Sequence, residues 1–165
     1  MKDYTDLKTR PVGEIKEESV KETVKELNFL LADEYALFTK ALNYHWNVKG
    51  PRFHSLHTFL EGQYNALLTV MDSIAERIRT LGETPEGTLE HLSEMNKLPE
   101  KNGNFLSANE MIYDLFSSNL KIQKQIKSIL KKEELFEDDF GTEDFLVGLL
   151  QKHEKTSWML KSHLE

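Results

Sequence analysis

Apolar residues recur along the first part of the chain at intervals of three, four or seven positions. From Val20 to Val48 they form one stripe, which predicts an amphipathic helix of about 30 residues. Two ionisable residues, Glu34 and His45, occupy that stripe where the pattern expects hydrophobic side chains. The helix is expected to end at Lys49-Gly50-Pro51, because glycine suits a helix C-cap and proline cannot continue the hydrogen-bond ladder.

The same periodicity predicts three further long helices. The second spans about Phe53 to Leu81, the third about Ser107 to Lys132, and the last about Thr142 to His163. The stretch from Glu83 to Gly103 is a long connection with two prolines, and residues Thr88 to Met95 within it have the length of one or two helical turns.

Four long helices with one long connection indicate an all-α, ferritin-like four-helix bundle. The long connection lets the second and third helices run parallel, whereas a loop of two to eight residues would make them antiparallel neighbours. We therefore predict one domain over residues 15–165, a crossover that contains a short extra helix, and a flexible leader over residues 1–14. A length of 165 residues fits a single domain.

Composition excludes several classes of protein. A formal net charge of -7 argues against a strongly basic nucleic-acid-binding surface. No apolar run reaches the roughly 18 residues of a membrane span. Cysteine is absent, which excludes disulfides, thiolate metal sites and thiol catalysis. Because the N-terminal residues contain no secretory signal, the expected location is the cytoplasm.

One flank of the second predicted helix carries four side chains of metal-binding types: His57, Glu61, Asp72 and Glu76. At about 100° per residue these positions fall within an arc of roughly 100°. Glu61 and Asp72 are nevertheless about 16 Å apart along the helix axis, at 1.5 Å per residue. One helix therefore cannot gather all four side chains around one metal cluster.

An antiparallel two-fold pairing of this helix with its copy in a second chain removes that difficulty. His57 then lies opposite Glu76. Glu61 lies opposite Asp72, and every dimer contains two identical sites. His45, from the first helix, is expected to pack beside His57 and complete a shell of two imidazoles and three carboxylates. Such a mixed nitrogen and oxygen set suits iron.

A di-iron site within one subunit is the competing arrangement for a ferritin-like bundle. It uses Glu-x-x-His motifs on facing helices. None of the six histidines has a glutamate three residues before it. The sequence therefore argues against a site of that kind.

The segments NYHWNVKGPRFHSLHTFLEGQY and MDSIAERIRTLGETPEGTLEHL resemble the Dps family, the DNA-binding proteins from starved cells. The resemblance runs from about Leu27 to Leu98 and resumes in GTEDFLVGLLQKHEKTSWMLKSHLE. It implies a hollow dodecamer with a two-metal ferroxidase centre at each two-fold site. One subunit would supply His45, His57 and Glu61, and its neighbour would supply Asp72 and Glu76.

The resemblance also implies a function, namely iron storage and detoxification. Fe(II) would be oxidised to Fe(III), preferentially by hydrogen peroxide, and a ferric mineral would be stored inside the shell. Trp46 is expected either to have a packing role or, as a tryptophan at this position does in the family, to lie close enough to the metals to intercept stray oxidising equivalents. Several family members have aspartate where this chain has Glu61, so the carboxylate arm is longer here. His54 is a weaker candidate for an additional ligand.

The alternative function is nucleoid protection by direct DNA binding, the activity that named the family. Members that bind DNA directly commonly carry a lysine-rich terminal tail. Residues 1–20 instead contain four cationic and five acidic side chains, which supply no counterion-release drive at neutral pH. Direct DNA binding is therefore disfavoured.

Several residues remain outside the predicted metal centre. Glu34 is expected either at a subunit interface or facing the hollow interior. Trp158 is expected in the core, and the acidic link from Glu133 to Asp139 in a solvated turn. The remaining histidines are expected to be surface or structural residues: His91, His153 and His163.

Overall fold

The computed structural model describes residues 15–99 and 106–165, and the regular elements within these ranges are all helical. The bundle consists of four long helices: α1 (Glu17–Asn47), α2 (Phe53–Thr80), α4 (Ala108–Leu130) and α5 (Phe140–Ser162). A short helix, α3 (Leu89–Met95), lies in the connection between α2 and α4, and a 3-10 turn, η2 (Glu133–Leu135), precedes α5. The predicted leader, residues 1–14, lies outside the described residues.

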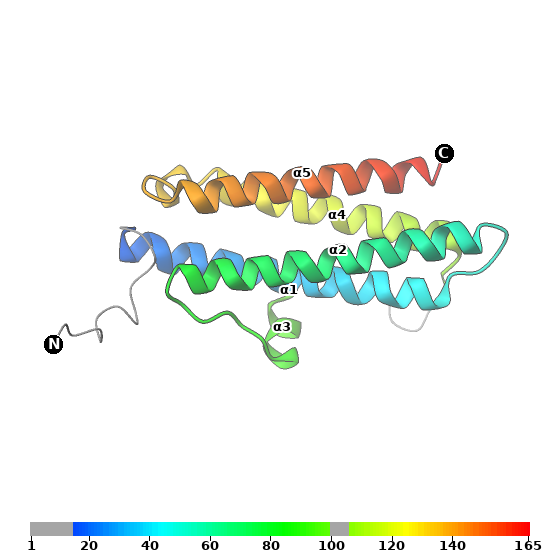
Figure 1. Ribbon diagram of the computed structural model, residues 1–165, viewed down its shortest axis with the longest axis horizontal. Helices are drawn as coiled ribbons and strands as arrows, with labels where there is room; N and C mark the ends of the chain where they lie inside the picture. Colours follow the sequence, from blue (N-terminus) through cyan, green and yellow to red (C-terminus); the bar gives the residue numbers. More distant parts are fainter. Residues whose placement is uncertain (1–14, 100–105) are drawn as a thin grey trace.

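The chain order produces a crossover between the two halves of the bundle. α1 and α2 form an antiparallel pair, as do α4 and α5, and α2 and α4 run in the same direction (Figure 1). The predicted ferritin-like four-helix bundle with a short helix in its long connection is thereby confirmed. Each helix end lies within three residues of its predicted position, because glycine, proline and capping residues mark the ends in the sequence.

Two side chains of α1 accept hydrogen bonds from backbone N–H groups of the long connection between α2 and α4 and so attach it to α1. The Asn28 side-chain oxygen accepts from the Glu86 N–H at 2.9 Å, and an Asp33 carboxylate oxygen accepts from the Lys97 N–H at 2.6 Å. Burial raises the pKa of the Asp33 carboxyl above its ordinary value, although the hydrogen bond from the Lys97 N–H favours the ionised form. α3 is thus held against α1 (Figure 1).

The core contains the apolar stripes of all four long helices. Each fully buried leucine or isoleucine contributes roughly 1.5–3 kcal/mol relative to an exposed side chain. Members of this core with the least exposure come from every long helix, including Leu27, Leu30, Ile74, Ile78, Ile122, Ile126 and Leu146.

Glu34 lies inside the bundle, which corrects both alternatives predicted for it. Its side chain is fully buried, and its Oε1 lies 2.7 Å from His153 Nε2 on α5. His153 Nδ1 lies 2.8 Å from Asn119 Oδ1, and the Asn119 amide nitrogen donates to the Leu115 carbonyl. The expectation of an interface or inward-facing glutamate fails because periodicity identifies a buried stripe but not the partner within it.

Trp158 is exposed, contrary to its predicted place in the core. Its side chain is 66% exposed, and Phe140 and Val147 are exposed on the same outward stripe of α5. α5 carries apolar residues on both its inner and its outer face, so periodicity does not select the buried one.

A membrane span requires a helix that is both long and apolar. Within residues 15–99 and 106–165, no helix combines the length and the apolar content needed to cross a bilayer.

Candidate metal centre

The turn between α1 and α2 brings His45 and His57 together. The two residues are each six positions from Pro51, so they face each other across the antiparallel hairpin. Gly50 makes the turn with a φ of 104°, a conformation that favours glycine. The two imidazole rings are stacked, with centroids 3.7 Å apart and an interplanar angle of 22°. The predicted packing of His45 beside His57 is therefore confirmed.

Each histidine is oriented by the backbone of the other. His45 Nδ1 lies 2.9 Å from the His57 carbonyl oxygen, and His57 Nδ1 lies 2.9 Å from the His45 carbonyl oxygen. A carbonyl only accepts hydrogen bonds, so both Nδ1 atoms must be the protonated ones. In the neutral rings both Nε2 atoms then have an available lone pair. Metal-binding histidines are typically held in this way.

Two aromatic rings enclose the histidine pair. Phe53 lies 5.0 Å from the His57 ring, and Tyr64 meets the His45 ring edge-on at 5.2 Å. His45 is buried and His57 is half-buried. Neither Phe53 nor Tyr64 was predicted from the sequence to be part of the site. Their spacing from His57, four residues before and seven after, places all three on one helix face and could have indicated the contact.

Three carboxylates on the same helix are exposed and have no cationic partner among the residues that the structure describes. Glu61, Asp72 and Glu76 form no hydrogen bond or ion pair with any side chain of the described residues. Leu68, between Glu61 and Asp72 along the helix, is 45% exposed on the same flank. An apolar residue surrounded by unpaired carboxylates is typical of a surface that a second chain and a cation would complete.

The described residues of one chain do not by themselves form a metal site. Within the described ranges, no three His, Asp or Glu side chains lie close enough together to hold a metal ion. The two histidines form one group, and the carboxylates beyond them extend along α2. His54 is exposed on the first turn of α2, outside the stacked pair.

Trp46 follows His45 in the sequence but does not pack on the histidine pair. Its side chain is 67% exposed, and among the described residues no ring contact joins it to His45 or His57. In one chain, Trp46 is therefore available to a second subunit.

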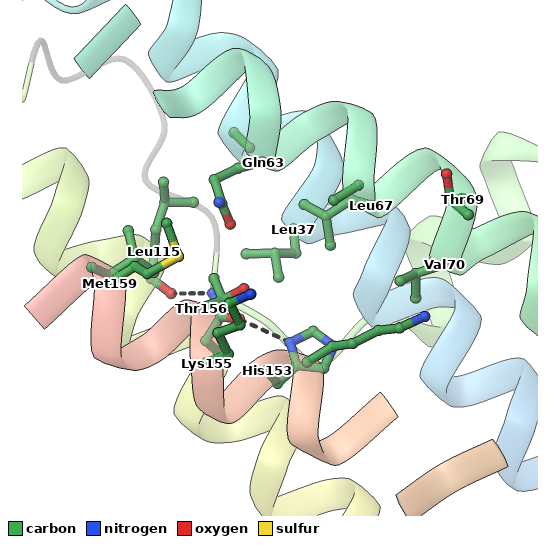
Figure 2. Close-up of a pocket in the computed structure, with 15 residues that line it drawn as sticks. Leu37, Gln63, Leu67, Thr69, Val70, Leu115, His153, Lys155, Thr156 and Met159 are labelled. Atoms are coloured by element: carbon green, nitrogen blue, oxygen red, sulfur yellow. Dashed lines mark hydrogen bonds between the residues drawn. The ribbon is translucent and has the colours of Figure 1, made fainter. Parts of the chain in front are cut away.

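A separate cavity lies between α2 and α5. It has a volume of about 430 Å³ and largely apolar walls, including Leu37, Leu67, Val70 and Leu115 (Figure 2). It lies on the flank of α2 that faces away from His57 and Glu61. Its wall includes His153, whose two ring nitrogens already face Asn119 and Glu34. The cavity is thus distinct from the histidine pair.

Comparisons with known proteins identify the family of the fold. Residues 24–165 match the family model of the ferritin-like domain. The chain is 40% identical over 139 residues to a low-temperature-induced protein of Nostoc sp., covering 84% of this chain and 78% of that protein. It is 35% identical over 147 residues to DNA protection during starvation protein 2 of Bacillus anthracis, covering 87% of this chain and 97% of that protein.

A solved structure shows the same arrangement of helices. The Dps protein of Vibrio cholerae, described as a member of a broad superfamily of ferritin-like diiron-carboxylate proteins, superposes with a TM-score of 0.84 at 27% identity. The superposition covers 92% of this chain and 94% of that one. From the fold, the length of the match and the level of identity, we conclude that the chain belongs to the Dps family of ferritin-like proteins.

Proposed function

We propose that this protein oxidises Fe(II) to Fe(III), with hydrogen peroxide as the preferred oxidant, and stores ferric iron inside a hollow dodecamer in the cytoplasm. The observation that carries the proposal is the reciprocal hydrogen bonding of His45 and His57. It leaves two Nε2 lone pairs, and a preorganised pair of imidazole ligands suits a transition metal. Iron is the substrate of this reaction.

The remaining ligands are proposed to come from a second subunit. Each chain has a histidine pair with Glu61 toward one end of α2 and two carboxylates, Asp72 and Glu76, toward the other. Antiparallel pairing about a two-fold axis would bring the two ends together and form two equal centres. The absence of a three-ligand cluster within the described part of one chain, and the unpaired carboxylates on α2, support this arrangement.

The ligand types account for the proposed selectivity and direction of the reaction. Imidazole nitrogens favour ferrous iron over magnesium, which prefers oxygen ligands. Carboxylates stabilise the higher charge of the ferric product. The longer arm of Glu61, relative to aspartate, would allow the carboxylate to follow the metal as its charge changes. Trp46 is proposed to face the partner subunit near the centre and to intercept stray oxidising equivalents.

The test compares anaerobic oxidation of Fe(II) by hydrogen peroxide in the wild type and in Asp72→Asn/Glu76→Gln. We expect the initial rate to fall by roughly tenfold or more, because two of the three carboxylates of each proposed ligand shell lose their charge. The rate is followed by ferric absorbance and by consumption of peroxide. Glu18→Gln/Glu83→Gln, which removes two exposed charges outside α2, is the matched control. A wild-type rate in the α2 variant would contradict the proposed centre.

A further inference from the structure

The row of rings around the two histidines continues into the body of the bundle. Tyr64 on α2 contacts the His45 ring edge-on, with the centroids 5.2 Å apart. Phe38 on α1 lies 6.3 Å from Tyr64, and Tyr35 lies 6.1 Å from Phe38. An uninterrupted series of ring contacts therefore leads from His45 to Tyr35.

Tyr44, Trp46 and Tyr64 are the oxidisable aromatic side chains nearest to the histidine pair along the two helices. The Tyr44 hydroxyl donates to Asp114 on α4 at 2.8 Å. Trp46 points away from the chain and is 67% exposed. Tyr64 is half-buried and packs against the hydrophobic core. Of these three residues, only Tyr64 has its ring in contact with a histidine of the pair within the described residues.

The electron count of the proposed reaction creates a need for such a residue. Hydrogen peroxide accepts two electrons when it is reduced to water, and one ferrous ion supplies one. A centre that holds a single ferrous ion therefore needs a second one-electron donor. Without that donor, the reaction with peroxide releases a hydroxyl radical. A tyrosine phenol can supply the missing electron together with its proton.

We propose that Tyr64 is this donor, an inference that rests on the proposed iron oxidation. The balanced step consumes Fe²⁺, H₂O₂, the Tyr64 phenol and one proton, and it forms Fe³⁺, a neutral Tyr64 phenoxyl radical and two molecules of water. The O–O bond of peroxide breaks, and the phenol O–H bond breaks as its proton leaves with the electron. His45 is the contact through which the electron passes to the iron. Phe38 and Tyr35 form the route by which the radical can leave the centre.

The test loads the assembled protein with one ferrous ion per centre, adds one equivalent of hydrogen peroxide, and freezes the sample for electron paramagnetic resonance. A parallel sample contains a spin trap for hydroxyl radicals. We expect a tyrosyl signal in the wild type. In Tyr64→Phe that signal should be lost and the trapped hydroxyl radical should increase severalfold. Tyr113→Phe, a change at an exposed tyrosine on α4, is the matched control and should behave as the wild type.

The variants also separate Tyr64 from Trp46. Trp46→Phe should retain the tyrosyl signal. An unchanged signal in Tyr64→Phe, or the absence of any protein radical in a wild type that oxidises iron, would overturn the inference. With two ferrous ions per centre the metals supply both electrons, so the tyrosyl signal of the wild type should be much weaker. If the wild type itself fails to oxidise iron under that condition, the proposed function fails rather than the role of Tyr64.

Discussion

His45 and His57 show how two side chains can fix each other's protonation. The His45 carbonyl lies in the last turn of α1, where carbonyls lose their intrahelical partners, and His57 Nδ1 satisfies it. The His57 carbonyl accepts the bond in the other direction. The same contacts that complete the helix end therefore leave both Nε2 lone pairs available to the proposed metal centre.

This arrangement predicts the tautomers of the metal-free protein. Both His45 and His57 should carry their proton on Nδ1 at neutral pH, because each Nδ1 faces a carbonyl oxygen. Solid-state ¹⁵N NMR of histidine-labelled protein measures this directly. His45→Ala removes the stacked ring but keeps the backbone carbonyl at position 45, so His57 should retain its Nδ1 proton. His54→Ala, at an exposed position, should leave both Nδ1–H signals in place. Nε2–H signals for both paired histidines would be incompatible with the reciprocal hydrogen bonds.

Residue types and their spacing in the sequence identified the residues of the candidate site. The sequence predicted that His45 packs beside His57, and their equal spacing of six residues on either side of Pro51 accounts for that contact. The carbonyl contacts of their Nδ1 atoms depend on ring orientation, which no spacing encodes. The partner of Glu34 was missed for a similar reason, since His153 is 119 positions away and no local pattern connects them.

At the scale of helices, the pair of Glu34 and His153 joins α1 to α5 across the bundle. Asn119 Oδ1 requires a proton on His153 Nδ1, so one further proton must lie between His153 Nε2 and Glu34 Oε1. The pair is thus neutral in total. Glu34 Oε2 has no hydrogen-bond partner among the described residues, so the carboxyl group depends on His153.

Substitution of His153 should therefore lower the free energy of unfolding more than substitution of Glu34. His153→Leu leaves a buried carboxyl group and the Asn119 oxygen without a donor, and it should destabilise the protein by about 3–5 kcal/mol. In Glu34→Gln, the amide can donate to a neutral His153 Nε2, so the loss should stay below about 1.5 kcal/mol. Denaturant unfolding followed by helix content compares the two variants at one protein concentration. Equal destabilisation of both variants would show that the pair does not share a proton.

The helices themselves were predictable because their ends carry strong signals. Gly50 and Pro51 separate α1 from α2, Gly82 ends α2 with a φ of 89°, and Ser107 begins α4 with a capping box. α5 lacks a single apolar face, and the position of Trp158 was accordingly predicted wrongly. Once the helices are placed, their packing in the bundle can be predicted. Which buried polar side chains pair with each other cannot be predicted in this way.

At the scale of the whole molecule, the proposed centre requires more than one chain. The exposed carboxylates of α2 are separated along the helix by too great a length for one cluster, and Leu68 lies exposed between them. The spacing in the sequence predicted a paired helix, but the geometry of a second chain is a property of the assembly. The central claim is therefore that each centre is shared between two subunits.

Complementation between two inactive variants tests that claim most directly. His45→Ala/His57→Ala lacks the histidine half of every centre, and Asp72→Ala/Glu76→Ala lacks two carboxylates from every centre. Each variant alone should lose fast peroxide-driven iron oxidation. The two chains are then unfolded, mixed in equal amounts and refolded together. A mixed dimer contains one complete centre and one centre that lacks both histidines and both of the partner's carboxylates.

With random pairing, half of the dimers are mixed and each restores one of its two centres. A shared centre therefore predicts recovery of about a quarter of the wild-type rate. Each variant refolded alone is the control, and the size of the assembled shells is verified in every sample. If each centre lay within one chain, no mixture could restore it. Activity no greater than that of the separate variants, in shells that contain both chains, would contradict the shared centre.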